Sequence, residues 1–231
     1  MATHGLHRLG AVSAIAGTVI AGISNAMHPA LTDPAGVVSN AAGSSSWAAI
    51  HWGLIVGIVL MQLGFYIVIG TLQIHPANTG TGEFGLLAAY TLTVGLVLWI
   101  SVFAAEIALK PLADAVRADP SSQTGALTLA SLADATATAA ICVYFFGITL
   151  LGWALLLSDH HPRWVSVMGL TVGAAITFTV GLRKAFLGAS NWTEGIPFQT
   201  LVVLFWTWTV ILAAHLWRNA SRTGDVARHV P

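Results

Sequence analysis

The segment Ala48–Leu72 reads AAIHWGLIVGIVLMQLGFYIVIGTL and contains no Asp, Glu, Lys or Arg. It is longer than the about 20 apolar residues that an α-helix needs to cross the hydrocarbon core of a bilayer. Its apolar residues do not alternate with polar ones, as they would in a strand of a membrane barrel. Since every backbone polar group within lipid must be bonded inside its own segment, we predict a transmembrane helix here.

The composition of the whole chain also indicates a membrane protein. Of its 231 residues, 56% are hydrophobic and only 8% are charged, with nine basic and nine acidic side chains. A soluble domain carries about 25% charged residues. The scarcity of charge therefore excludes an ordinary soluble protein, and the absence of a basic excess excludes nucleic acid as a partner. The single cysteine, Cys142, excludes an internal disulfide and a CxxC motif.

Five further apolar segments resemble the first one in length and composition. We therefore predict an all-α polytopic integral membrane protein, a single six-helix transmembrane bundle over residues 1–218 followed by a polar tail over 219–231. The lipid bilayer is then its first partner. The spans are expected at about 9–27, 48–72, 84–109, 127–157, 165–182 and 198–217.

Proline marks the predicted ends of several segments. The pairs His28-Pro29, His75-Pro76, His161-Pro162 and Lys110-Pro111 each follow an apolar run. Proline lacks a backbone donor and disfavours the helical conformation in the residue before it. We therefore expect helices to end at these four pairs, and a loop over residues 29–46.

The positive charges decide the predicted orientation. With six spans both termini lie on one side, and that side holds five arginines against four basic residues on the other side. Positive charge favours the cytoplasmic side, so we predict a multi-pass protein of the cell membrane with both termini in the cytoplasm. The five are Arg8, Arg163, Arg218, Arg222 and Arg228, and the four are Lys110, Arg117, Arg183 and Lys184.

Small residues and tryptophans have conventional explanations in such a bundle. Ridges of small residues let helices approach closely, either within one chain or against a second copy or another membrane subunit. Tryptophans at segment ends are typical of an interfacial aromatic belt. The ridges are Ser13/Gly17/Ala21, Gly53/Gly57 and Gly169/Gly173, and the end tryptophans are Trp47, Trp52, Trp164, Trp192 and Trp217.

Four ionisable residues fall at one membrane face when the spans alternate in direction. They are His28, His51, Glu106 and Asp134, one from each of four helices. Ionisable groups are costly in lipid and often functional. Two imidazoles and two carboxylates could bind a divalent metal ion such as Zn²⁺, Mn²⁺ or iron, or could relay protons. We predict that these four residues form a site for a metal, a proton or a substrate.

The same residues also have structural explanations. Glu106 lies four residues before Lys110, so the two could form a helix-surface ion pair, and Arg183 could neutralise either acid. Asp134 could face water, and the two histidines could bond to loop carbonyls. No HExxH or paired ExxH motif strengthens the metal interpretation.

Two further predictions concern single residues. Gln62 falls in the middle of its span, where its amide either bonds across helices or belongs to a substrate pathway. Haem is not expected, because only His51 and His215 fall inside predicted helices and they lie at opposite ends.

Three classes of function remain. The first is a small-solute or proton-linked transporter that uses the histidine/carboxylate cluster. The second is a membrane enzyme or redox subunit with a metal at that cluster, and the third is an accessory subunit without chemistry. The sequence identifies no catalytic residue. It lacks a P-loop, a GxSxG elbow and a dinucleotide fingerprint.

Overall fold

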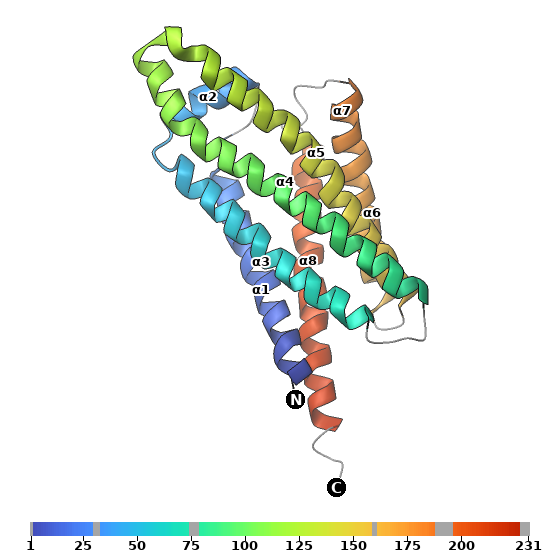
Figure 1. The fold of residues 1–231 in the computed structure, drawn as a ribbon. Coiled ribbons are helices and arrows are strands. Elements are labelled where there is room, and N and C mark those ends of the chain that lie inside the picture. Colours follow the sequence, from blue (N-terminus) through green and yellow to red (C-terminus); the bar gives the residue numbers. More distant parts are fainter. Residues whose placement is uncertain (1, 30–32, 74–78, 159–160, 188–195, 227–231) are drawn as a thin grey trace.

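The computed structural model describes residues 2–29, 33–73, 79–158, 161–187 and 196–226 (Figure 1). Its elements in this part of the chain are all helical, which confirms the predicted all-α class. In chain order they are α1 (Ala2–Met27), α2 (Pro34–Gly43), α3 (Trp47–Gln73), α4 (Thr79–Ala118), the 3-10 helix η1 (Pro120–Ser122), α5 (Gln123–Leu157), α6 (Arg163–Ala175), the π-helix η2 (Ile176–Leu182), α7 (Arg183–Leu187) and α8 (Ile196–Val226).

Six stretches of the described chain are long and apolar enough to cross a membrane: α1, α3, α4, α5, α8, and α6 continued through η2 and α7. Each packs against the next in the order α1, α3, α4, α5, α6 and α8, and α8 packs back against α1. The six spans therefore form a closed ring. The start of α1 and the end of α8 lie at the same end of the bundle (Figure 1). We call this the terminal end, and the other the α2 end.

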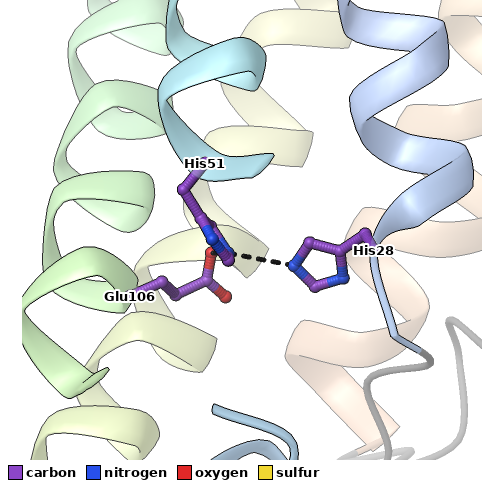
Figure 2. Close-up of side chains that lie close together, drawn as sticks. All are labelled: His28, His51 and Glu106. Atoms are coloured by element: carbon purple, nitrogen blue, oxygen red, sulfur yellow. Dashed lines mark hydrogen bonds and ion pairs between the residues drawn. The ribbon is translucent and has the colours of Figure 1, made fainter. Parts of the chain in front are cut away.

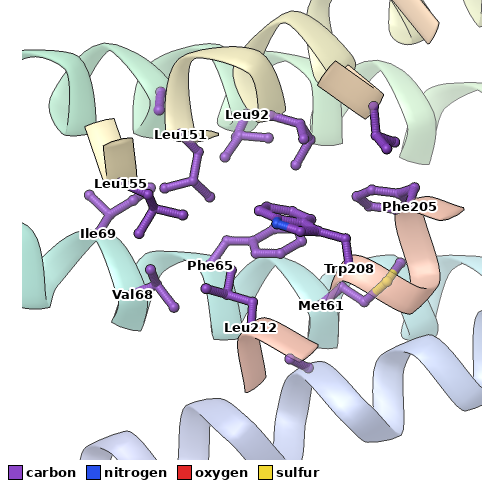
Figure 3. Packing of buried hydrophobic residues seen from close by; sticks show 14 of the residues in the cluster. Met61, Phe65, Val68, Ile69, Leu92, Leu151, Leu155, Phe205, Trp208 and Leu212 are labelled. Carbon is purple, nitrogen blue, oxygen red and sulfur yellow. The ribbon is translucent and has the colours of Figure 1, made fainter. Parts of the chain in front are cut away.

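Aromatic and aliphatic side chains fill the interior toward the terminal end (Figure 3). Phe65 of α3 contacts Trp208 of α8 with ring centroids 5.8 Å apart, and Leu92 and Leu151 belong to the same cluster. The fully buried Trp208 donates its indole N–H to the Val165 carbonyl at 2.9 Å. A buried indole needs such a partner, so this bond fixes α8 against α6.

Small residues bring α1 and α3 together. A Cβ atom built on Gly17 would lie 2.5 Å from the carbonyl oxygen of Gly57, and one built on Gly57 would lie 2.8 Å from the Ala21 side chain. Only glycine permits this approach, because a larger side chain would collide with backbone of the facing helix. The ridges predicted on these two helices thus pack within one chain.

The prediction that Lys110-Pro111 ends a helix is wrong, since α4 continues through Pro111 to Ala118. Packing holds the helix on both sides of the proline, because Leu109 before it and Ala113 after it are fully buried against α2 and α5. Lys110 also pairs with Asp114 one turn later, at 2.6 Å. Tertiary contacts therefore compensate for the one helical hydrogen bond that proline removes.

The helices α4 and α5 are much longer than a membrane requires. At 1.5 Å per residue, their 40 and 35 residues span about 60 and 53 Å, whereas the hydrocarbon core is about 30 Å thick. At the α2 end they extend beyond the other helices as a hairpin (Figure 1). The hairpin turns at η1, where Asp119 accepts a hydrogen bond from the Ser121 N–H at 2.9 Å.

The segment predicted as a loop over residues 29–46 contains α2. Asp33 caps this helix by accepting from the Gly36 N–H at 2.6 Å, and Pro34 occupies its first turn. Its buried residues Val38 and Ala41 pack on the α4–α5 hairpin. An Asp-Pro pair is a recognised helix start, so the sequence did hold a signal for α2.

The other predicted proline boundaries have different outcomes. His28-Pro29 follows the end of α1 directly, as expected. The helix α5 ends earlier than His161-Pro162, at Leu157, and Pro162 instead precedes the first residue of α6. The pair His75-Pro76 lies outside the described residues.

Candidate metal centre

Three of the four residues predicted at one face converge at the α2 end (Figure 2). The Nε2 atoms of His28 and His51 are 3.0 Å apart, and His51 Nε2 lies 3.0 Å from Glu106 Oε2. One ligand atom from each of the three residues lies within 4.8 Å of the other two. The chain therefore brings two imidazole nitrogens and one carboxylate oxygen to a common point.

Each of the three residues comes from a different helix. His28 follows the last residue of α1, where its backbone N–H bonds back to the Asn25 carbonyl at 3.2 Å. His51 lies one turn into α3, and Glu106 lies on α4, five residues before Pro111. Because α1 rises to this face while α3 starts from it and α4 returns to it, the alternation of spans places all three at the same depth.

The second ring nitrogens fix the tautomers of both histidines. His51 Nδ1 lies 2.6 Å from the Trp47 carbonyl oxygen, and His28 Nδ1 lies 2.7 Å from the Pro29 carbonyl oxygen. A carbonyl oxygen can only accept a hydrogen bond, so each Nδ1 carries the proton. In the neutral rings both Nε2 atoms then present lone pairs, and they face each other and a carboxylate oxygen.

The three residues differ in their access to solvent. His51 is fully buried and Glu106 is only 5% exposed, whereas His28 is partly exposed. Burial lowers the pKa of His28, and the neighbouring His51 lowers it further, while Glu106 and the bond to Pro29 oppose this change. The neutral, electron-donating form of His28 is therefore favoured.

Trp47 holds this arrangement together, and sequence reasoning missed its role. It is fully buried, so its assignment to the interfacial belt is wrong. Its indole N–H donates to the Glu106 carbonyl at 2.6 Å, and its ring centroid lies 4.5 Å from that of His51 and 5.5 Å from that of His28. The spacing Trp47-x-x-x-His51, which stacks the two rings on one helix face, was the available signal.

Asp134 does not join the cluster, although it lies toward the same end. Its carboxylate pairs with Lys184 of α7. The predicted Glu106–Lys110 pair is also wrong, because Lys110 pairs with Asp114 and Glu106 with His51.

Arg183 and Gln62 also lie apart from the three residues. Arg183 is exposed at the start of α7, and among the described residues no ion pair joins it to Glu106. Gln62 lies eleven residues after His51 on α3, about 16 Å along the helix axis. Its amide is buried, and neither of its polar atoms has a hydrogen-bond partner among the described residues.

The geometry of the cluster suits a first-row transition metal. At a Zn–N distance of about 2.0–2.1 Å, tetrahedral ligands are separated by about 3.3 Å. The His28–His51 and His51–Glu106 separations of 3.0 Å are close to this value, and all three ligand atoms lie within 4.8 Å of one another. Two histidines with one carboxylate are also a known ligand set for Fe²⁺. Both histidines donate their other N–H to a backbone carbonyl, as metal-bound histidines usually do. Three protein ligands leave at least one coordination position free.

Comparison of the chain with protein families, with curated proteins and with solved structures finds no match.

Proposed function

We propose that the protein is a membrane-embedded metalloenzyme in which His28, His51 and Glu106 bind one divalent transition-metal ion, Zn²⁺ or Fe²⁺. One observation carries this proposal: His51 Nε2 lies at hydrogen-bond distance from two other electron-pair donors, His28 Nε2 and Glu106 Oε2, while both Nδ1 protons are already bonded to carbonyls. Neutral rings with this tautomer have no proton to place between their Nε2 atoms. A cation is therefore needed to stabilise the cluster.

A metal ion satisfies the three donors better than a proton does. If His51 carried a second proton, its Nε2–H would lie 3.0 Å from both the His28 nitrogen and the Glu106 oxygen, and it could point well at only one of them. A metal ion at the common point binds all three at once.

The free coordination position favours an enzyme over a purely structural metal site. Structural zinc sites are usually closed by four protein ligands, whereas catalytic sites use three and leave a position for water or substrate. A water molecule bound there would be acidified by the metal, which also polarises a bound carbonyl oxygen.

The packing of the bundle counts against the transporter interpretation. A transported solute must pass between the cluster and the terminal end, and that part of the ring is filled by Phe65, Leu92, Leu151 and Trp208. The cluster does not extend into this packed region. Gln62 places one buried amide there, far from the cluster, and so does not form a polar path with it.

The proposal is tested by metal analysis of the purified protein. We expect about one zinc or iron per chain, and loss of this metal in His51→Ala. His215→Ala is the matched control, because His215 also lies in a spanning helix, near the terminal end, and should leave the metal content unchanged. Failure of the wild-type protein to bind Zn²⁺, Fe²⁺ or Mn²⁺ after metal removal and reconstitution would overturn the proposal.

A further inference from the structure

A partly open cavity of about 100 Å³ lies between five of the six spanning helices. Its lining is aliphatic and aromatic and contains no charged side chain. Few of its lining residues carry a hydrogen-bonding side-chain group: Tyr144, Asn25, Trp99 and Trp206. The cavity volume is of the same order as that of an engineered protein cavity, about 150 Å³, that accommodates benzene.

The cavity lies directly beneath the candidate metal centre. Residues three positions apart on a helix share a face and differ in depth by about 4.5 Å. Each of the three ligand residues has a cavity-lining neighbour at this spacing, on the side toward the membrane interior. The pairs are Asn25 with His28, Leu54 with His51, and Phe103 with Glu106.

Phe103 connects the two sites. It lines the cavity, and its ring centroid lies 6.2 Å from that of His51. The cavity and the metal-ligand residues therefore share one aromatic neighbour.

Tyr144 supplies the second, independent observation. Its side chain is 1% exposed and lines the cavity, yet its hydroxyl has no hydrogen-bond partner among the described residues. A buried hydroxyl that lacks a partner is destabilising, and native proteins retain few of them. A partner bound in the adjacent cavity would satisfy it.

We propose that this cavity is a ligand site next to the metal centre, and that it binds a small, uncharged, mainly apolar molecule that carries one hydroxyl or carbonyl oxygen. The apolar wall selects the body of the molecule, and the Tyr144 hydroxyl selects its oxygen. The absence of charged lining groups excludes a charged ligand. None of the three metal-ligand residues lines the cavity, so its occupancy can be measured independently of the proposed metal site.

Fluorinated probes test the binding. In detergent-solubilised protein, ¹⁹F NMR should show 4-fluorobenzyl alcohol binding more tightly than 4-fluorotoluene, which lacks the hydroxyl. Tyr144→Phe should weaken binding of the alcohol about five- to tenfold, as expected for loss of one hydrogen bond, and should leave binding of 4-fluorotoluene unchanged.

A pair of neighbouring variants separates the cavity from the micelle. Val202 lines the cavity, whereas Val203 is 55% exposed on the outer face of α8. Val202→Trp should fill the cavity and abolish probe binding, and Val203→Trp should bind as the wild type does. Equal binding by wild type and Val202→Trp would overturn the cavity site. An unchanged affinity of the alcohol in Tyr144→Phe would overturn the role of the hydroxyl.

The ligand site and the metal site can fail separately. Probe binding by a protein that takes up no metal would refute the proposed function alone. Metal uptake by a protein that binds no probe would overturn the ligand site alone.

Discussion

Glu106 and Asp134 are acidic residues on neighbouring helices near the same end of the bundle, but their surroundings differ. Glu106 is almost fully buried and pairs with His51, which also faces His28. The side chain of Asp134 is 52% exposed and pairs with the Lys184 ammonium. A carboxylate with its own lysine needs no further cation, whereas Glu106 lies beside groups that cannot all be satisfied without one. The group that each carboxylate pairs with, more than its depth in the membrane, therefore distinguishes the candidate site at Glu106 from the ordinary ion pair at Asp134.

The largest expected difference between these two acids is in metal affinity. Glu106→Gln removes a charged ligand, so we expect Zn²⁺ affinity to fall at least about 100-fold, the upper end of the effect of losing an outer-shell contact. Asp134→Asn should change it less than about twofold. Competition titration with a chromophoric chelator measures both values. Equal losses in the two variants would contradict the conclusion that Glu106 is a ligand and Asp134 is not.

A smaller effect is expected from Trp47, which anchors the backbone of Glu106. Trp47→Phe keeps an aromatic ring but loses the bond to the Glu106 carbonyl. We expect the free energy of unfolding to fall by about 1–3 kcal/mol and Zn²⁺ affinity to fall about tenfold. Thermal unfolding in detergent and the same chelator titration measure these changes.

Trp52 offers the matched control for that prediction. It lies on the same helix but is 57% exposed, so Trp52→Phe should change the free energy of unfolding by no more than about 0.5 kcal/mol. If both tryptophan variants behaved alike, Trp47 would be a belt residue after all.

The smallest effect concerns pH. Burial lowers the pKa of His28 below its ordinary value of 6.5, so above pH 6.5 the ring is neutral in both folded and unfolded states. As the pH falls below 6.5 the unfolded chain takes up the proton first, and the metal-free folded protein loses stability until the lower pKa of the folded state is passed. Thermal unfolding between pH 8 and pH 5 should therefore depend less on pH in His28→Asn than in wild type. A steeper dependence in the variant would contradict the sign of the pKa change.

The sequence sufficed to predict the spans and the shared face of the site. Ala48–Leu72 and the other apolar runs are long enough to identify transmembrane helices, and counting their direction placed His28, His51, Glu106 and Asp134 toward one end. Which of these side chains point inward could not be derived, because helices that are apolar on nearly all sides show little periodicity.

Two local features account for the remaining errors. The π-helix η2 widens the turns just before Arg183 and Lys184, so α-helical periodicity could not tell which of the two faces Asp134. The helix α4 continues through Pro111 because α2 and α5 pack beyond it, and those contacts exist only in the folded chain.

The projecting α4–α5 hairpin offers a way to learn which compartment would supply a metal ion to the proposed centre. The hairpin turn at Asp119 and the three ligand residues lie toward the same end of the bundle, so they face the same compartment. An epitope inserted at that turn would report which compartment this is. Metal choice in cells depends strongly on local availability, so the compartment at this end of the bundle would influence which ion the proposed ligands bind.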